Sequence, residues 1–389
     1  MTGKRAPKAT LFLLGTLEVG GSEKKIVSLA RRLRQKGLPV HVAYLRPPAT
    51  LLAELDGVPT VHLQQNGKLS FGAWRNLVAY VREHNIQNIV TVNFYPLIYA
   101  LPLKWRLGSA NISVIASINT SEFQGGREKA IRFLYIRLLR RVNQVIFGAQ
   151  NQQELWHREY LHNDVPSAVI LNGVDSQRFD PAAECTAVSR ADFGIGSSDR
   201  VLVTVAKLRP EKGHDRLFRA IESIGRDDLV KVHLFVVGDG EQKERLSSLA
   251  RSLGIQNEVH FVGTVEDVRP YLRLADLFLL TSIAVETFSN SALEAASMGL
   301  PVVISDVGGA REMFPDGSGA IIYDRDSEED LVSAIKRQLD RLPISDEFAA
   351  MIRSKIVDRF STSKMDEAWS HAIWSTDELA ESGRPGANF

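Results

Sequence analysis

The chain reads LLTSIAVETFSNSALEAASMGLPVV over residues 279–303. The apolar run at its start predicts a buried strand, and a helix is expected to begin around Ser289 to Ser291 and to end at Gly299, before a further strand. Glu286 then lies in the loop after the first strand, and Glu294 lies in the first turns of the helix. Both carboxylates are therefore expected at the carboxyl end of a strand, where parallel sheets bind their ligands.

This spacing allows two interpretations of the carboxylate pair. In the first, Glu286 accepts hydrogen bonds from sugar hydroxyls, and Glu294 holds both ribose hydroxyls of a nucleotide. The amides at the expected helix start would then bind phosphate oxygens; they belong to Phe288, Ser289 and Asn290. In the second, Ser291 and Glu294 form a capping box and Glu286 is simply solvated.

The same pattern of apolar strands alternating with helices extends through both halves of the chain. Such runs predict parallel sheets covered on both faces, so two doubly wound domains are expected, with their strand ends facing a cleft. The expected strands are Thr10–Leu14, Val40–Tyr44, Asn88–Val92, Ser113–Ser117, Arg200–Ala206, Lys231–Val237, Glu258–Val262, Leu277–Leu280 and Pro301–Ser305.

The joint between these domains is expected in the turn-rich segment 171–181. Asn172-Gly173 predicts a tight turn, and Asp175 can cap a short helix. The predicted domains are therefore residues 1–171, residues 172–355 and a C-terminal helical segment, 356–389.

In each half, the first strand leads into a loop suited to phosphate. Gly20-Gly21-Ser22 precedes one helix, and residues 207–213, with Lys207 and Lys212, precede the other. Glycines let backbone amides approach an anion, and helix starts and lysines add positive charge. Either loop alone is more commonly a tight turn or a solvated lysine pair, but together they indicate a diphosphate ligand.

Several short motifs occur in a familiar order. They are Gly20-Gly21-Ser22-Glu23, Asn172-Gly173-Val174-Asp175 with Phe179, Lys207 to Gly213, Val237-Gly238-Asp239-Gly240, Phe261-Val-Gly263, and Glu286 to Glu294 followed by Gly299-Leu-Pro-Val. This series resembles retaining glycosyltransferases of family 4, and it extends over nearly the whole chain. The resemblance implies the GT-B fold, in which two Rossmann-like domains face a cleft and a C-terminal helix crosses back to the first domain.

The resemblance also implies a role for individual residues. Glu286 would contact the donor sugar and Glu294 the ribose, while Lys207 and Lys212 would bind the diphosphate. Gly20 and Gly21 would close over the phosphates from the acceptor side, and Gly238 and Val265 would lie near the base.

Three departures from the family pattern affect these roles. Lys207 stands where the family usually has Arg, which keeps the charge but loses the bidentate fork, and Arg209 is close enough to substitute. Asn119 stands where many members carry a His on the acceptor side. The segment 282–286 is one residue longer than usual.

Three other residue groups have less specific interpretations. Asp324-Arg325-Asp326 imitates a metal-binding motif, but it precedes an acidic helix start, so no divalent metal and no other cofactor is predicted. His214 is expected to cap the helix that it begins. Cys185 is the single cysteine, so no internal disulfide can form and a reducing, cytoplasmic compartment is expected.

The charge is unevenly distributed. Residues 1–171 hold 22 Lys and Arg against 10 Asp and Glu, whereas the remainder holds 25 against 36. An amphipathic helix over residues 127–141 carries a large share of the basic side chains, namely Arg127, Lys129, Arg132, Arg137, Arg140 and Arg141. It either packs on the core with solvated arginines or docks at the cytoplasmic face of an anionic membrane. An acidic or lipid-linked acceptor fits this charge, and no nucleic-acid partner is predicted.

Two apolar stretches of the sequence were compared with membrane segments, and neither predicts membrane insertion. The apolar run after the basic N-terminus is interrupted by Glu18 and has no cleavage pattern, so a first strand is expected rather than a secretion signal. The longest uncharged stretch, residues 88–103, is shorter than the roughly 20 residues of a membrane span, so it predicts a strand and a helix start.

The function that the resemblance implies is transfer of a sugar, with retention, from a nucleotide diphosphate donor to an acceptor hydroxyl. UDP is the expected carrier by family analogy, and cell-surface polysaccharide or glycolipid synthesis is the expected setting. Three alternatives stay open: a nucleotide-sugar epimerase, a sugar phosphorylase, and a non-catalytic GT-B binding subunit.

Overall fold

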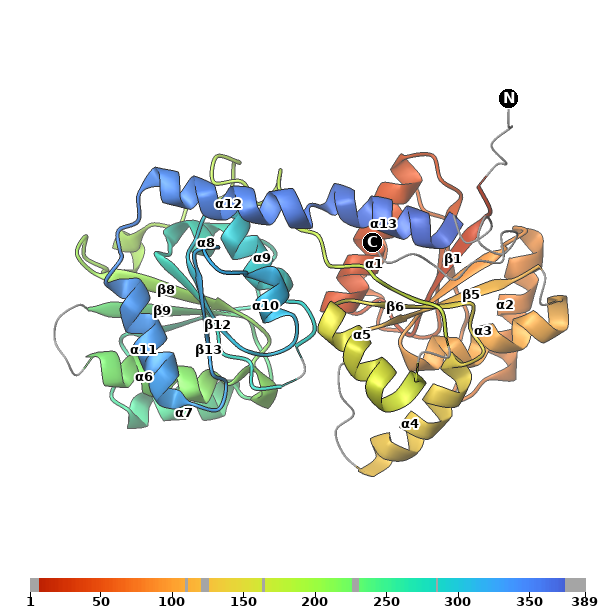
Figure 1. The fold of residues 1–389 in the computed structure, drawn as a ribbon, viewed down its shortest axis with the longest axis horizontal. Helices are drawn as coiled ribbons and strands as arrows, with labels where there is room; N and C mark the ends of the chain where they lie inside the picture. Colours follow the sequence, from red (N-terminus) through yellow and green to blue (C-terminus); the bar gives the residue numbers. More distant parts are fainter. Residues whose placement is uncertain are drawn as a thin grey trace. The chain divides into compact units, whose positions relative to one another are not determined.

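The computed structural model describes residues 7–108, 111–119, 126–162, 165–225, 231–284 and 286–374, with residues 126–131 described by their backbone alone. The chain forms two compact units (Figure 1). The first contains the residues up to Leu171 and those from Ser363 onward, and the second contains Asn172–Thr362. Each unit has its own sheet and core.

The first unit is built on a parallel sheet, which has seven strands among the described residues, in the order β3-β2-β1-β4-β5-β6-β7. The strands are β1 (Thr10–Leu14), β2 (Val40–Tyr44), β3 (Thr60–His62), β4 (Asn88–Val92), β5 (Ser113–Ile118), β6 (Gln144–Phe147) and β7 (Ser167–Val169). The helices are α1 (Gly21–Gln35), α2 (Phe71–Glu83), α3 (Phe94–Leu107), α4 (Gly126–Leu139), α5 (Gln150–Trp156) and α13 (Thr362–Trp374).

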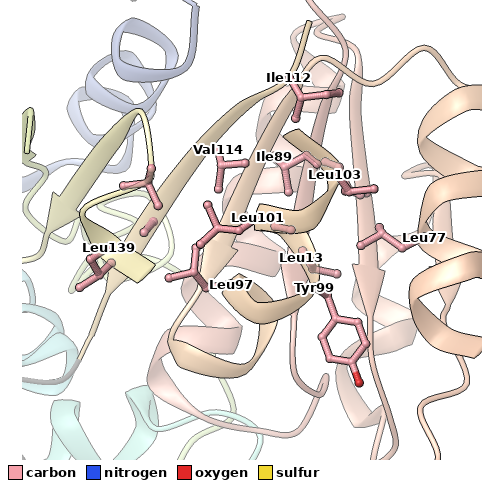
Figure 2. Close-up of a cluster of buried hydrophobic side chains, with 14 of the residues drawn as sticks. Leu13, Leu77, Ile89, Leu97, Tyr99, Leu101, Leu103, Ile112, Val114 and Leu139 are labelled. Atoms are coloured by element: carbon pink, nitrogen blue, oxygen red, sulfur yellow. The ribbon is translucent and has the colours of Figure 1, made fainter. Parts of the chain in front are cut away.

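Strand β1 shows why this sheet is covered on both faces. Its side chains alternate, so that Leu11 and Leu13 join the core beneath α2 and α3, while Phe12 and Leu14 join the core beneath α1 and α13. Figure 2 shows Leu13 among side chains of α3 and the neighbouring strands. Burial on both faces explains why the strands are near-continuous apolar runs.

The C-terminal helix α13 packs on the first unit. The buried Trp369 lies edge-on to Phe12, with ring centroids 6.3 Å apart. The Asp366 carboxylate, 2% exposed, accepts hydrogen bonds from Arg32 and Lys36 of α1. Removing either side of a buried ion pair is costly, so this contact holds α13 firmly on α1.

The second unit has a parallel sheet of six strands within the described ranges, in the order β10-β9-β8-β11-β12-β13. The strands are β8 (Arg200–Val205), β9 (Val232–Val237), β10 (Val259–Gly263), β11 (Leu277–Leu280), β12 (Val302–Ser305) and β13 (Ala320–Tyr323). The helices are α6 (His214–Gly225), α7 (Lys243–Ser252), α8 (Arg269–Leu274), α9 (Asn290–Ser297), α10 (Ala310–Met313), α11 (Glu328–Leu339) and α12 (Asp346–Phe360).

The predicted fold class is confirmed: two Rossmann-like parallel-sheet units, with a C-terminal helix on the first. Expected and observed strands agree to within about a residue at each end. The predicted strand and helix start over residues 88–103 correspond to β4 and to α3, which continues past Pro102. Helix α12 packs on α9, and the chain changes unit at the break between α12 and α13, around Ser361. No helix in the described ranges is long and apolar enough to cross a membrane.

Candidate active site

The loops after β8 and β11 are joined at the carboxyl edge of the second sheet. The Thr281 hydroxyl donates to the carbonyl oxygens of Lys212 and Gly213, at 3.1 and 3.2 Å, and the Ile283 amide donates to that of Glu211 at 2.9 Å. Gly213 has φ +64°, and a Cβ there would lie 2.2 Å from the Thr281 carbonyl oxygen. Only glycine allows this approach, which brings the two loops' side chains together.

Lys212 and Glu286 form an ion pair between these loops. Lys212 Nζ lies 2.6 Å from Glu286 Oε2, and the Ser282 hydroxyl donates to the same oxygen at 3.1 Å. The two charged side chains are 20% and 13% exposed. Within the described part of the chain, Glu286 Oε1 accepts no hydrogen bond. One carboxylate oxygen is therefore fixed in place, and the other can accept a ligand hydroxyl.

The loop after β12 supports the backbone that carries Glu286. Gly308 has φ +60°, and a Cβ there would lie 2.0 Å from the Glu286 carbonyl oxygen. The Gly309 amide donates to the Thr287 carbonyl at 2.8 Å, and the Ser305 hydroxyl donates to the Ser282 carbonyl at 2.6 Å. The loops after β8 and β12 thus hold this segment against the sheet.

Asn172 also fixes this segment, although it lies far away in the sequence. Its side-chain Nδ2 donates to the Phe288 carbonyl and to Asn290 Oδ1, both at 3.0 Å. The Phe288 side chain is buried, and its ring meets that of Phe360 edge-on at 5.4 Å. The sequence predicted only a turn at Asn172, because its partners are 116 and 118 residues away and no local pattern indicates them.

Helix α9 begins differently from the capping-box alternative. Ser289 is its N-cap, and the Ser289 hydroxyl accepts from the Ala292 amide at 3.3 Å. Ser291 is then already inside the helix and Glu294 lies in the second turn, so the Ser291–Glu294 capping box is wrong. The partly buried Glu294 is not needed to cap the helix start.

The other predicted donor-binding residues follow neighbouring strands of the same sheet. Lys207 and Arg209 follow β8 with exposed side chains, and Arg209 Nη1 lies 3.8 Å from Glu211 Oε1. Gly238 directly follows β9 with φ +136°, where a Cβ would lie 2.0 Å from the carbonyl oxygen of Ala206, the residue after β8. Val265 lies in the loop after β10, partly buried. Parallel strands end at one edge, so these residues share the edge that holds Glu286.

The remaining predicted residues belong to the first unit. Gly20 is the N-cap residue of α1, Gly21 begins that helix, and Asn119 follows β5. A Cβ on Gly20 would meet only the flexible carboxylate end of Glu23, which can move aside.

His214 does not cap α6, contrary to the sequence-based prediction. Its side chain is 3% exposed, and neither ring nitrogen has a hydrogen-bond partner within the described residues. Burial, with a smaller contribution from the Lys212 charge, lowers the pKa of His214 to about 4. The imidazole is therefore neutral near pH 7 and packs in the core.

The motif Asp324-Arg325-Asp326 forms part of a helix start. The Asp324 amide donates to Asp330 Oδ2 at 2.7 Å, and the Asp326 amide donates to Asp324 Oδ1 at 3.0 Å. Ser327 then caps α11 by accepting from the Asp330 amide. Among the residues that the structure describes, no three His, Cys, Asp or Glu side chains are arranged to hold a metal ion.

Comparison with protein families matches both units. Residues 19–178 match the model of glycosyltransferase family 4, and residues 186–353 match that of glycosyl transferases group 1. A lipopolysaccharide core biosynthesis glycosyltransferase of Rhizobium meliloti is 28% identical over 197 residues, which cover 51% of this chain and 56% of that protein. A GDP-mannose-dependent phosphatidylinositol monomannoside mannosyltransferase of Mycolicibacterium smegmatis is 27% identical, covering 66% of this chain and 68% of that protein.

Solved structures share the fold over almost the whole chain. A glycosyltransferase of Rickettsia africae superposes with a TM-score of 0.79 at 18% identity, covering 94% of this chain and 98% of that one. An Anabaena protein in complex with UDP superposes with a TM-score of 0.78 at 20% identity, covering 94% and 99%. The chain belongs to glycosyltransferase family 4 and has the GT-B fold.

Proposed function

We propose that the protein transfers a hexose, with retention, from a nucleotide diphosphate donor to an acceptor hydroxyl. The observation that carries this proposal is the Lys212–Glu286 pair, which Ser282 orients at the sheet edge beside the start of α9. A carboxylate that keeps one oxygen available suits a sugar hydroxyl, and a lysine next to a helix start suits a diphosphate. Family membership and the sugar-transferring relatives support the same reaction.

We assign the donor's parts to residues by their chemistry. Lys207, Lys212 and the amides of Ser289 and Asn290 bind the diphosphate, and Arg209 supplies the guanidinium that position 207 lacks. Glu286 accepts hydrogen bonds from the transferred sugar. The ribose meets Glu294, and the base lies near Gly238 and Val265. Phe288 holds the loop through its buried ring rather than touching the donor.

In the proposed reaction, the acceptor oxygen bonds to the anomeric carbon on the face from which the diphosphate leaves. The bond between that carbon and the phosphate oxygen breaks, and the acceptor's proton passes to the departing phosphate. Lys212 is already positioned beside Glu286, so it can be shared with the diphosphate as negative charge develops there. Stabilising such charge by prearranged groups is usually the largest contribution to catalysis.

UDP is the proposed carrier, although the Mycolicibacterium smegmatis relative depends on GDP-mannose. The test is thermal stabilisation of the purified chain by UDP-glucose, UDP-galactose and GDP-mannose, because a ligand that binds the native state raises its melting temperature. We expect a UDP-sugar to give the largest shift, and the same donor to yield an α-linked product with a suitable acceptor.

Three other results would contradict this proposal. An isomer formed from donor alone would indicate an epimerase. Sugar phosphate formed from a glycan and inorganic phosphate would indicate a phosphorylase. No stabilisation by any donor would indicate a non-catalytic subunit.

We propose further that the acceptor belongs to a polysaccharide or glycolipid and that the first unit docks on an anionic membrane. Helix α4 exposes Phe133 (73%) and Leu134 (46%), whereas its Tyr135 and Leu139 are buried. Beside it, Trp105 is 73% exposed. For two of the predicted basic residues, Arg127 and Lys129, the structure describes the backbone but not the side chain.

The exposed apolar side chains have basic neighbours. Arg137, Arg140 and Arg141 are exposed, and the Arg141 guanidinium lies 5.6 Å from the centre of the Trp105 ring. Aromatic and basic side chains on one surface suit an anionic interface.

Vesicle flotation tests this docking. We expect the chain to float with phosphatidylglycerol vesicles at low salt and not with phosphatidylcholine vesicles. The double variant Phe133→Ser, Leu134→Ser should stay in the bottom fraction, while the control Phe71→Ser, equally exposed on α2, should float. Wild-type protein that stays in the bottom fraction would overturn membrane docking.

A further inference from the structure

A lysine in the first unit lies at the acceptor-side strand ends without a carboxylate partner. Lys25 projects from the second turn of α1, and its Nζ donates to Asn119 Oδ1 at 3.0 Å. The side chain is partly buried, and burial lowers the pKa of Lys25 to about 8. In the described ranges no carboxylate forms an ion pair with this ammonium group.

The Lys25 partner belongs to a polar cluster that follows adjacent strands. The Asn119 amide donates to Asn93 Oδ1 at 3.3 Å, and the Asn93 amide donates to the Ser117 carbonyl at 3.0 Å. Asn93 itself has φ +64° and ψ −165°, a conformation that favours glycine. Lys25, Asn119 and Asn93 therefore lie together where β4 and β5 end.

The same helix shows how a purely structural cation is accommodated in this protein. Two turns further along α1, Arg32 and Lys36 both contact the buried carboxylate of Asp366. Lys25 instead contacts a neutral amide, which fixes its direction, and no carboxylate among the described residues balances its charge. Removing a cation from water without an anion costs free energy, so a role for the charge itself is indicated.

We propose that Lys25 and Asn119 form a subsite for an oxyanion, a phosphate or carboxylate group, on the acceptor. One N–H of the ammonium group is used by Asn119, and the two others can donate to the anion. An anion at this place would balance the charge that no described carboxylate balances. The assignment of this anion to the acceptor substrate rests on the proposed function, whereas anion binding at Lys25 does not.

Amine labelling of the whole protein tests anion binding directly. Trace acetylation at pH 8 followed by mass spectrometry gives the labelling of each lysine, and the adjacent, exposed Lys24 is the internal control. Glycerol 3-phosphate, used near saturation as a phosphomonoester probe, should reduce Lys25 labelling by about fivefold or more and leave Lys24 unchanged. Unchanged Lys25 labelling would overturn the proposal.

A second arm separates an acceptor anion from the donor's own diphosphate. With the donor site saturated by UDP, protection of Lys25 by glycerol 3-phosphate should persist. Protection by UDP alone, with no further effect of the phosphomonoester, would assign Lys25 to the donor and overturn the acceptor subsite. The Glu286→Gln variant should keep the protection, so a failure of sugar transfer and a failure of this subsite are distinguishable.

Substitution supplies an independent measurement. Lys25→Met removes the charge at similar length, and calorimetry should show glycerol 3-phosphate binding weakened by about 10- to 100-fold, as expected for loss of a charge-assisted hydrogen bond. Lys24→Met should bind as wild type. Equal binding by Lys25→Met and wild type would exclude the subsite, and thermal melting checks that both variants fold.

Discussion

Lys212 and Lys25 occupy comparable places in the two units, since each follows the first strand of its sheet, and yet they differ in charge balance. Lys212 lies 2.6 Å from the Glu286 carboxylate, whereas Lys25 lies 3.0 Å from the neutral Asn119 amide. The Lys212 pair is a prepared arrangement in which a donor can redistribute charge. The Lys25 cluster contains no carboxylate among the described residues. Equivalent topology therefore gives two kinds of charge balance.

Breaking the Lys212–Glu286 ion pair should have the largest effect on turnover. Glu286→Gln keeps the shape of the side chain but removes the charge that faces Lys212 and, in the proposed function, the donor sugar. We expect turnover to fall by about 100- to 1,000-fold, the range found when one electrostatic group of an active site is lost. Steady-state rates with the preferred donor measure this effect, and melting should stay close to that of wild type.

Glu241→Gln is the matched control for this change, because Glu241 is exposed in the turn before α7. It should keep full turnover. A Glu286→Gln enzyme as active as this control would remove Glu286 from the mechanism.

Displacing the Glu286 loop should have the next largest effect. In Gly308→Ala the new Cβ meets the Glu286 carbonyl oxygen at 2.0 Å, so the loop must shift. We expect turnover to fall by about tenfold or more, because catalytic groups tolerate little misplacement. Gly254→Ala is the control, since Gly254 has φ +74° but nothing within 4 Å of its Cβ. If the two variants lose equal activity and stability, the backbone conformation rather than the clash is responsible.

Removing the distant support of this loop should have a smaller effect. Asn172→Ala loses the hydrogen bonds to the Phe288 carbonyl and to Asn290. We expect donor affinity to fall by about tenfold, since a buried hydrogen bond contributes about 0.5–1.5 kcal/mol and two are lost. Titration calorimetry with UDP measures the change. Asn257→Ala, in an exposed turn, should bind normally, and equal affinities for the two variants would show that Asn172 does not hold the loop.

Substitution of Lys25 should give the smallest effect. The affected quantity is the melting temperature, and the effect depends on pH. The pKa of Lys25 is about 8 in the folded chain and near 10.5 when unfolded, so the folded state disfavours the ammonium form. This penalty is complete below about pH 8 and disappears as pH rises through 10.5. Lys25→Met should therefore melt a few degrees above wild type at pH 7, with the gain shrinking towards pH 10.

Lys24→Met, with its ammonium in water, should show no such gain at any pH. Added phosphate should narrow the difference between wild type and Lys25→Met at pH 7, because an anion favours the charged amine. A lower melting temperature for Lys25→Met at pH 7 would mean that Lys25 stabilises the fold by itself.

Much of the fold was predictable because each strand of a covered parallel sheet is a local apolar run. Strands such as β1 and β11 begin and end where the sequence analysis expected them. The loop and helix that carry Glu286 and Glu294 were also expected, because a glycine such as Gly299 commonly follows the end of a helix. In the structure Gly299 has φ +83°, as this role requires. The identity of the cap was not, because Ser289 and Ser291 are both good N-caps and the backbone at Ser289 decides between them.

The candidate site was only partly predictable. Glu286 and Lys212 were each named from their own motifs. Nothing local indicated that Lys212 would form an ion pair with the Oε2 oxygen of Glu286. His214 was misassigned because its place after a glycine suggests a cap, whereas in the structure its side chain is buried.

The amino-acid order alone therefore determined the elements, the family motifs and the kinds of charge available to the site, because those depend on residues within one or two turns of each other. The tertiary structure decided which charges are balanced. Glu286 comes to Lys212 from 74 residues away, and Asn119 comes to Lys25 from 94. Such pairings depend on how parallel strands place their loops along one edge, so a carboxylate meets the lysine in one unit and an amide in the other.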